Sequence, residues 1–266
     1  MDSPEKPERA EAQSPRAEHT APDHTAPKHT APEHTAPARS TQDGAADEPS
    51  RRIARRWPLI SGAVAVVLAF LLGALILTRG QGRPIEADVE WMEEILEHRS
   101  RIWEVPALVM NFLGAGVAGV FVIPILILVM LLVLRRPWAA GYFLVATVLS
   151  AGLVQLLKTL FGRARPEDMM ITSDYGSFPS GHVANAATMA MAFAIIFPRL
   201  WVWIAGAVYT VAMMVSRTYL GAHWLTDTIG GLLLGAGVAI VLWAPVAAKL
   251  DGEDELSRRR RHPLTG

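Results

Sequence analysis

The chain has 266 residues, of which 51% are hydrophobic, and its 25 Lys and Arg residues balance 25 Asp and Glu residues. It contains no cysteine, which excludes disulfide bonds, thiolate metal sites and cysteine nucleophiles. Apolar residues are concentrated between positions 58 and 247, so the length suits one membrane domain with a polar tail and excludes a second large folded domain.

Residues 1–50 form a polar segment rich in Pro, Ala, Glu and Thr. The sequence His-Thr-Ala-Pro occurs four times in this segment, and its copies begin at His19, His24, His29 and His34. Such a segment lacks the apolar surface needed to offset the entropy of ordering, so it is predicted to be a disordered tail. The period of the histidines matches no fixed metal-ligand geometry, which disfavours a metal-binding tract.

The first membrane span is predicted from Pro58 to Thr78, a run about long enough to cross a bilayer core. By the positive-inside rule, the arginines just before it keep the N-terminus in the cytoplasm: Arg51, Arg52, Arg55 and Arg56. The segment after the span is acidic, and Val89, Met92 and Ile95 recur there at helical spacing. This pattern predicts a short helix on the outer surface, which is either solvated or in contact with substrate.

Further apolar runs predict an all-α fold, a bundle of six transmembrane helices. These runs cover approximately 105–134, 138–157, 183–197, 200–215 and 224–247. The Lys and Arg residues at their ends place both termini in the cytoplasm. The predicted domains are the tail at 1–50, the six-span domain at 51–250 and a short basic cytoplasmic tail at 251–266. Some cations fall on the outer side against this rule, and a functional cluster explains the exception: Lys158, Arg163, Arg165 and Arg217.

Three polar motifs lie on this outer side. The first joins Lys158 to Arg165-Pro166, the second is Pro179-Ser180-Gly181-His182, and the third runs from Ser216-Arg217 through His223 to Asp227. Ionisable residues beside hydrocarbon are costly, so their presence indicates a function. Cations, histidines, a carboxylate and a Ser-Gly turn at a helix start together suit phosphoryl transfer, in which the protein mainly positions the phosphate and stabilises its charge.

Each cationic or turn residue has a physical reason to occupy its position. Arg165 and Arg217 can each bind two phosphate oxygens with a planar guanidinium group, and Lys158 adds a point charge. Ser180 and Gly181 lie where a helix is predicted to begin, so their free N–H groups and the helix dipole can hold an oxyanion.

His223 and Asp227 are four residues apart, so on a helix they share one face. Asp227 can keep one ring nitrogen of His223 protonated and direct the other nitrogen toward phosphorus as a nucleophile. His182 is then available to protonate the leaving oxygen and later to activate water. The residues alone leave open which of the two histidines attacks.

The three motifs resemble the signature motifs of the type 2 phosphatidic acid phosphatase superfamily of membrane lipid phosphate phosphatases, and every motif position matches in order. The resemblance covers roughly residues 55–247. It implies a six-helix membrane fold, a phosphohistidine intermediate on His223, an orienting role for Asp227 and a general-acid role for His182. It also implies that no metal or other cofactor takes part, and that the phosphate is bound by Lys158, Arg165, Ser180, Gly181 and Arg217.

Several residues outside these motif positions carry separate predictions. Arg163 is expected to be a solvated loop cation rather than a headgroup contact. Asn111 and Gln155 lie within predicted spans, where hydrogen bonding between helices is expected. The carboxylates between the first two motifs lack the tight ligand spacing of a hard-cation site: Glu167, Asp168 and Asp174. Glycines of the last span are expected to allow close helix packing: Gly230, Gly231, Gly235 and Gly237.

The sequence therefore predicts an enzyme of the cell membrane that hydrolyses a lipid phosphate or diphosphate at the external face, with no nucleic-acid partner. Polyprenyl diphosphate, phosphatidic acid and phosphatidylglycerophosphate are the candidate substrates. One alternative is a non-hydrolytic lipid-phosphate carrier or flippase-like protein, which would need no carboxylate to orient a nucleophile. Another is haloperoxidase-like chemistry at a similar anion site, but those enzymes are soluble and six spans argue against it.

Overall fold

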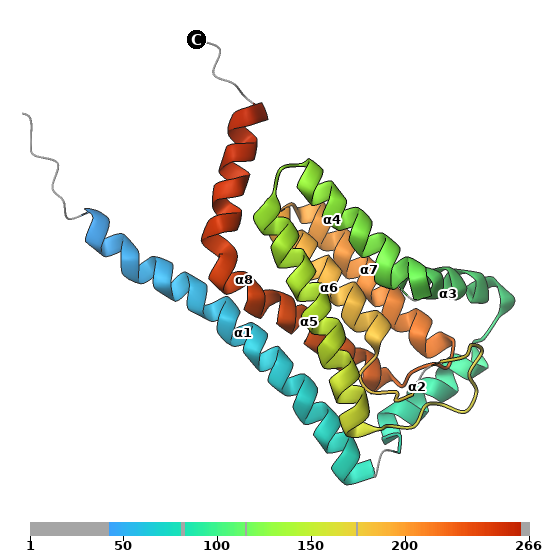
Figure 1. Cartoon of the computed structure of the whole chain (residues 1–266). Helices are drawn as coiled ribbons and strands as arrows, with labels where there is room; N and C mark the ends of the chain where they lie inside the picture. Colours follow the sequence, from blue (N-terminus) through green and yellow to red (C-terminus); the bar gives the residue numbers. More distant parts are fainter. Residues whose placement is uncertain (1–42, 81–82, 115, 174, 262–266) are drawn as a thin grey trace, which may run out of the picture. The chain divides into compact units, whose positions relative to one another are not determined.

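A computed structural model describes residues 43–80, 83–114, 116–173 and 175–261, and every regular element within these ranges is helical (Figure 1). The elements in chain order are α1 (Asp43–Gly80), α2 (Glu86–Glu97), α3 (Arg101–Gly114), the π-helix η1 (Ala118–Val122), α4 (Ile123–Val133), α5 (Pro137–Phe161), α6 (Gly181–Ile196), α7 (Leu200–Tyr219) and α8 (Leu225–Arg261). The predicted all-α class is therefore confirmed for the described part of the chain.

The predicted terminal segments fall partly outside these ranges. Residues 1–42 of the predicted tail and residues 262–266 at the C-terminus lie outside the described residues. Helix α1 begins at Asp43, so it includes the last residues of the predicted tail. Helix α8 continues to Arg261, through most of the predicted C-terminal segment. Both helices are thus longer than the apolar runs that predict them.

Several helices are long and apolar enough to cross a membrane. Four qualify singly, at Arg56–Arg79, Pro137–Phe161, Leu200–Tyr219 and Leu225–Ser257. A fifth span results if α3 and the segment Ala118–Val133, which meet at a bend of 49°, cross together. Helix α6 is apolar but has only 16 residues, so its length does not qualify it. The described helices indicate a multi-pass membrane protein with four or five candidate spans, where the apolar runs predict six.

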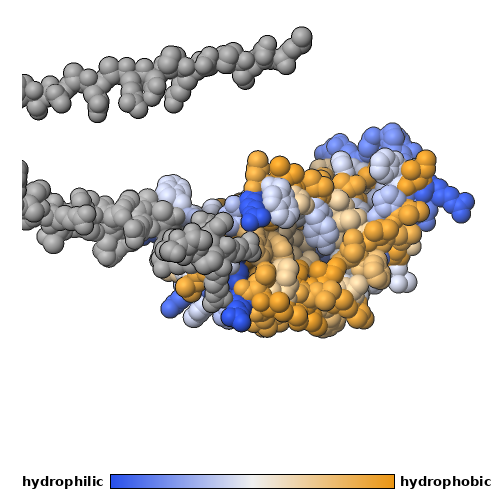
Figure 2. All heavy atoms as spheres, turned by 90° about the horizontal axis from the view of Figure 1, so that it is seen from above, coloured by the Kyte–Doolittle hydropathy of each residue, from blue (hydrophilic) through white to orange (hydrophobic). Residues whose placement is uncertain are grey.

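The outside of the bundle exposes large apolar side chains. Figure 2 shows hydrophobic residues over much of the visible face, with hydrophilic residues gathered mainly toward one side. Trp57, Val133 and Leu200 are 69%, 75% and 76% exposed. Apolar surface of this extent marks contact with another apolar phase, and lipid supplies that phase around a multi-pass protein.

Glycines bring α8 close to α1 and α6. A Cβ atom on Gly237 would lie 2.9 Å from the carbonyl oxygen of Gly62 in α1, and one on Gly235 would lie 2.2 Å from the carbonyl oxygen of Ala184 in α6. The helix-packing role predicted for the glycines of the last span is therefore confirmed for Gly231, Gly235 and Gly237, whereas Gly230 lies against the ring of Phe178 in the loop before α6. Helix α6 lies against α5, α7 and α8, and its Val183 is completely buried.

The predicted surface helix is confirmed as α2, which packs against α7 and α8. Met92 is buried, and Ile95 packs against Tyr219 and Leu220 at the end of α7. Asp88, on the same helical face, is completely buried as well. Helix α2 is therefore an integral part of the packed domain, and only its other face is solvated.

Replacing Gly235 by Ala should destabilise the protein, because the added Cβ atom would overlap the backbone of α6. Overpacking of this kind costs about 1–3 kcal/mol, which exceeds the roughly 1 kcal/mol that Ala gains over Gly inside a helix. Gly141→Ala in α5 is the matched control, since a Cβ atom there meets nothing within 4 Å. Thermal unfolding in detergent should show a lower midpoint for Gly235→Ala only. Equal midpoints for the two variants would contradict the close packing of α6 and α8.

Candidate active site

The three sequence motifs meet where α5 and α7 end and where α6 and α8 begin. Lys158 is in the last turn of α5, Arg217 is in the last turn of α7 and Asp227 is in the first turn of α8. The backbone N–H of Ser180 donates to the Asp227 carbonyl oxygen at 2.9 Å, which joins the second motif to the third. The structure groups all the predicted site residues in this region: Lys158, Arg165, Ser180, Gly181, His182, Arg217, His223 and Asp227.

His223 is buried between a carboxylate and a cation. Its Nδ1 atom is 3.6 Å from Asp227 Oδ2, and its Nε2 atom is 3.2 Å from a terminal nitrogen of Arg165. A proton on Nδ1 would face Asp227 and would leave the Nε2 lone pair on the side of the cation. The Nδ1–Oδ2 distance is longer than a hydrogen bond, and catalytic contacts of this kind often tighten when substrate binds.

The turn between α7 and α8 explains how His223 reaches this position. Gly221 has a φ of +66°, and a Cβ atom there would lie 2.4 Å from the carbonyl oxygen of Asp168. Any residue with a side chain would be strained and would clash with the neighbouring loop. The backbone N–H groups of Ala222 and His223 donate to the Arg217 carbonyl oxygen at 3.1 and 3.3 Å, so the turn also ties His223 to the end of α7.

The carboxylate of Asp227 is completely buried and has partners at both oxygens. Oδ1 accepts a hydrogen bond from Arg163 Nη1 at 2.5 Å. Oδ2 accepts from the backbone N–H of Trp224 at 2.9 Å and from the hydroxyl of Ser177. The Ser177 hydroxyl oxygen is also 3.5 Å from His223 Nδ1. Together these contacts fix the plane of the carboxylate beside the histidine ring.

The prediction for Arg163 is wrong, because this residue is not a solvated loop cation. Its side chain is 1% exposed and bridges two carboxylates, with Nη2 2.5 Å from Asp88 Oδ2 and Nη1 2.5 Å from Asp227 Oδ1. Sequence reasoning missed Asp88 altogether. The signal was that Asp88 shares a helical face with Met92 and Ile95, at spacings of four and seven residues, and a carboxylate on an apolar face is uncommon unless it is paired.

The start of α6 also differs from the prediction in one respect. The backbone N–H of Ser180 is not free to hold an anion, because it donates to the Asp227 carbonyl oxygen. The N–H groups of Gly181 and His182, in the first turn of the helix, are the candidate donors instead. Among the described residues, the Ser180 hydroxyl and His182 Nε2 are buried without a hydrogen-bond partner. Because His182 also lines the cavity at the end of α5, its unpartnered Nε2 is a candidate contact for a polar ligand.

The guanidinium groups of the site are held by neutral acceptors. Arg217 Nη1 donates to Asn111 Oδ1 in α3 at 2.5 Å, which confirms the hydrogen bond between helices that is predicted for Asn111. Arg165 donates to the carbonyl oxygens of Ala222 and Gly176 at 2.6 and 2.9 Å. These hydrogen bonds help to orient the two guanidinium groups within the site.

A cavity of about 700 Å³ opens beside these groups. Its polar end is lined by Lys158, Gly181, His182 and Arg217, and much of the remaining wall consists of apolar residues of η1, α4 and α5. Gln155, which is predicted to bond between helices, lies in this wall. Cationic groups at one end and apolar space beyond them suit an amphiphile with an anionic headgroup.

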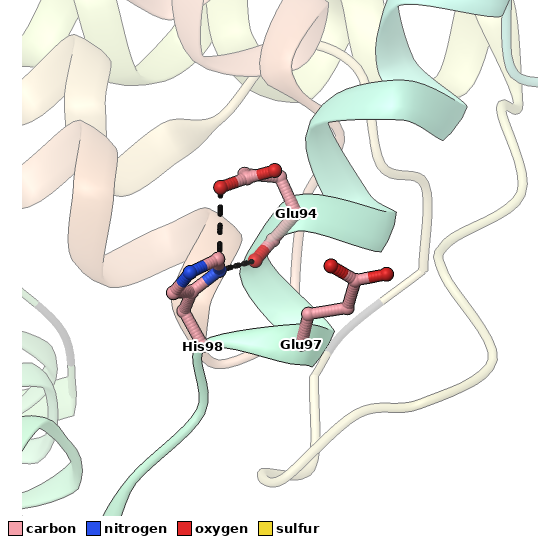
Figure 3. A group of neighbouring side chains, drawn as sticks. All are labelled: Glu94, Glu97 and His98. Atoms are coloured by element: carbon pink, nitrogen blue, oxygen red, sulfur yellow. Dashed lines mark hydrogen bonds and ion pairs between the residues drawn. The ribbon is translucent and has the colours of Figure 1, made fainter.

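A separate group of potential metal ligands lies at the end of α2. Glu94, Glu97 and His98 each bring one ligand atom within 4.8 Å of the others, and all three residues are exposed (Figure 3). His98 Nδ1 is 3.0 Å from the Glu94 carbonyl oxygen and 3.2 Å from Glu94 Oε1, so the ring is held at the helix end. The group shares no residue with the candidate active site and therefore adds no ligand to it.

The environment of His223 keeps its ring neutral near pH 7. The pKa of His223 is lowered from 6.5 to about 4, mainly because the ring is buried. The charges of Arg217 and Arg165 lower this pKa further, whereas the interaction with the Asp227 carboxylate raises it. A neutral ring has the lone pair that a nucleophile needs.

A family comparison matches the part of the chain that carries this site. Residues 139–250 match the model of the PAP2 superfamily, and this range contains every predicted site residue. This region of the chain is therefore similar to the PAP2 superfamily. The family resemblance of the three motifs is thereby confirmed.

Curated relatives of this chain are named as lipid phosphatases. Lipid A 1-phosphatase of Rhizobium johnstonii is 35% identical over 119 residues, which cover 39% of the chain and 46% of the relative. Undecaprenyl-diphosphatase of Sulfolobus acidocaldarius is 31% identical over 121 residues, covering 42% and 58%. Phosphatidylglycerophosphatase B of Bacillus subtilis is 31% identical over 130 residues, covering 44% and 64%. The chain thus spans about half to just under two thirds of the length of these relatives.

Solved PAP2 structures share the fold. A transmembrane PAP2-type phosphatidylglycerolphosphate phosphatase from Bacillus subtilis is similar with a TM-score of 0.60 and 24% identity, over 74% of this chain and 96% of that one. Aquifex aeolicus LpxE is similar with a TM-score of 0.52 and 25% identity, over 58% of this chain and 93% of that one. The chain therefore has the fold of the PAP2 membrane phosphatases.

Nitrogen-15 NMR of histidine-labelled protein in detergent should show His223 neutral throughout the range from pH 8 to pH 5. The sign follows from a lowered pKa of about 4, since the ring gains its proton only when the pH falls to that value. The signal of His223 is identified by its loss in His223→Gln. A titration of that signal near pH 6.5 would show that burial does not lower the pKa of His223.

Proposed function

We propose that this chain is an integral-membrane phosphatase that hydrolyses a lipid phosphate or diphosphate through a phosphohistidine intermediate on His223. The observation that carries the proposal is the placement of His223. Its Nδ1 faces the buried carboxylate of Asp227 at 3.6 Å, its Nε2 lies on the cationic side 3.2 Å from Arg165, and an amphiphile-sized cavity opens alongside. A carboxylate behind an imidazole and cations in front of it are the arrangement that nucleophilic attack on phosphorus requires.

Substrate binding begins with the phosphate at the polar end of the cavity. Lys158, Arg165 and Arg217 neutralise its oxygens, and the first-turn amides and the hydroxyl at the start of α6 donate hydrogen bonds to them. The lipid portion lies along the apolar wall formed by η1, α4 and α5. Because Lys158 and Arg217 are buried in a low-dielectric region, they stabilise the charge that spreads over the equatorial oxygens more strongly than they would in water.

Two displacement steps complete the reaction. In the first step, His223 Nε2 forms a bond to phosphorus while the bond from phosphorus to the leaving oxygen breaks, and His182 gives that oxygen a proton. The negative charge of Asp227 stabilises the positive charge that develops on the His223 ring. In the second step, His182 takes a proton from water, the water oxygen attacks phosphorus, and the bond to His223 breaks to release inorganic phosphate.

The cavity and the names of the relatives both support a lipid phosphate or diphosphate as the substrate class. Lipid A, undecaprenyl diphosphate and phosphatidylglycerophosphate, the lipids named for the relatives, all combine a phosphorylated headgroup with long apolar chains. Polyprenyl diphosphate, phosphatidic acid and phosphatidylglycerophosphate are therefore the substrates to test first. A non-hydrolytic carrier is less well supported, because a carrier does not need a buried carboxylate directed at a histidine. Haloperoxidase-like chemistry is disfavoured by the several helices long enough to span a membrane.

For the topology, we propose six spans, with both termini in the cytoplasm and the active site at the external face of the cell membrane. Helix α6 would be the sixth span, since its 16 residues extend about 24 Å and its N-terminus leads directly into the buried motif of Ser180. Arg135, Arg136 and Arg199 lie at the ends of α4, α5 and α7 opposite the site, where the positive-inside rule favours cytoplasm.

Single cysteines should report this orientation without background, because the chain has no cysteine of its own. Glu97→Cys, at the end of α2, should react with a membrane-impermeant thiol reagent in intact cells, and Arg199→Cys should react only after the membrane is opened. Both residues are exposed in the structure, so access depends on the side of the membrane alone. The opposite pattern would place the active site in the cytoplasm.

Phosphate release from the lipid panel in detergent tests the function itself. Purified protein should release phosphate in the presence of a chelator, and His223→Ala should lower kcat by at least about 1,000-fold, because no other group replaces the nucleophile. His98→Ala, which removes an exposed histidine far from the motifs in sequence, is the matched control and should keep full activity. Full activity of His223→Ala would rule out the nucleophile assignment, and loss of activity with chelator would rule out a metal-independent reaction.

A further inference from the structure

Arg163 is a buried cation between two buried carboxylates on different helices. Its Nη1 donates to Asp227 Oδ1 at 2.5 Å and to the hydroxyl of Thr226 at 2.7 Å, and its Nη2 donates to Asp88 Oδ2 at 2.5 Å. Asp88 and Asp227 are both completely buried. The guanidinium group therefore joins α2, a helix outside the candidate spans, to the first turn of α8.

Asp88 also contacts the start of α8 directly. Its Oδ1 accepts a hydrogen bond from the backbone N–H of Thr226 at 2.9 Å, and each of its oxygens lies 2.9 Å from the Thr226 hydroxyl. A carboxylate that accepts from a first-turn amide stabilises a helix N-terminus. Asp88, Arg163 and Thr226 thus enclose the turn that carries Asp227.

Arg163 reaches the candidate nucleophile only through Asp227. It binds Oδ1 of that carboxylate, whereas His223 faces Oδ2. Both terminal nitrogens of Arg163 bind carboxylates and its side chain is 1% exposed, so Arg163 is not placed to contact a bound phosphate. A residue in this position influences the direction and the charge of the carboxylate, and through them the histidine.

We propose that Arg163 and Asp88 are positioning residues of the phosphatase site. Arg163 holds one oxygen of Asp227 so that the other stays directed at His223 Nδ1, and Asp88 holds Arg163 in turn. This inference rests on the proposed function, in which His223 attacks phosphorus. The bridge needs an arginine, because a planar guanidinium group can donate to two carboxylates at once, whereas an ammonium group is a single point charge.

The two residues act on His223 with opposite signs. Arg163 offsets negative charge on Asp227, so Arg163→Gln strengthens the negative field at the ring and raises the pKa of His223. Asp88 offsets the charge of Arg163, so Asp88→Asn leaves more positive charge beside Asp227 and lowers the pKa of His223. The other charged or titratable groups facing the ring are unchanged in both variants: Lys158 in α5, His182 in α6, Arg217 in α7, Asp227 in α8 and Arg165 in the loop before α6.

The test compares the pKa of His223, measured by nitrogen-15 histidine NMR, with kcat and KM for the lipid phosphate that the wild type cleaves fastest. Arg163→Gln and Asp88→Asn should shift the pKa in opposite directions, upward and downward respectively. Arg163→Gln should lower kcat about 10–100-fold, the usual effect of losing a group that orients a catalytic ligand, with KM changed much less. Glu90→Gln, on the exposed face of α2, is the matched control and should leave all three quantities unchanged.

A conservative variant separates charge from geometry. Arg163→Lys keeps the charge, so the pKa of His223 should stay near that of the wild type, while kcat should recover only in part because one ammonium group cannot bridge both carboxylates. If a single variant does not fold, the double variant Asp88→Asn with Arg163→Gln removes both charges together. It should show a pKa near the wild-type value and a reduced kcat.

The inference would be overturned if the pKa of His223 shifted in the same direction in Arg163→Gln and Asp88→Asn, or did not shift in either variant. A wild-type kcat in Arg163→Gln or in the double variant would also overturn it. A merely structural role would lower the unfolding temperature without producing opposite pKa shifts. A wild type that releases no phosphate from any substrate would contradict the proposed function alone, since the NMR measurement needs no turnover.

Discussion

The buried carboxylate of Asp227 is the group on which the rest of the site depends. One of its oxygens is bound by Arg163, and the other accepts hydrogen bonds from Ser177 and Trp224 and faces His223. Its backbone carbonyl accepts from Ser180 at the start of α6. Segments that are distant in sequence are therefore held together by a single residue in the first turn of α8.

Burying such a carboxylate is costly unless every oxygen has a partner, and the surrounding fold supplies these partners from outside the candidate spans. Helix α2 brings Asp88 against Arg163, and the loop before α6 brings Ser177. The glycines of α8 meanwhile let α6 approach closely enough for the backbone at its N-terminus to bond the backbone carbonyl oxygen of Asp227. Close helix packing and polar pairing therefore both hold the residues of the anion site in place beside the apolar cavity.

The sequence predicts the parts of this protein that depend on local pattern. Apolar runs locate α1, α5, α7 and α8, and helical spacing locates α2. His223 and Asp227 face each other as predicted, but His223 lies in the turn before α8 and not on the helix that the prediction assumed. The bend between α3 and the segment formed by η1 and α4 could not be predicted, because the sequence there reads as one uninterrupted apolar run. The short α6 fits no length rule, because its place among α5, α7 and α8 depends on tertiary packing.

The pairing of Asp88 with Arg163 and Thr226 could not be predicted from the sequence, for a physical reason. These residues are 75 and 138 positions apart from Asp88, and no spacing rule connects a surface helix to the start of the last span. Asp88 is one of seven acidic residues between Glu86 and Glu104, and charge alone does not indicate which of the seven is buried. In the same way, the sequence predicts a free N–H at Ser180, but the tertiary contact with Asp227 occupies it.

The central claim is that phosphorus bonds covalently to His223 during turnover. The most direct measurement is rapid acid-free quenching of a single turnover with a phosphorus-32-labelled lipid phosphate, followed by peptide mapping, in the wild type and in His182→Ala. An alkali-stable, acid-labile label should appear on His223 during turnover of the wild type, and loss of His182 should slow both its formation and its attack by water. Rapid phosphate release with no label on His223 in either protein, or a label on any other residue, would contradict the account.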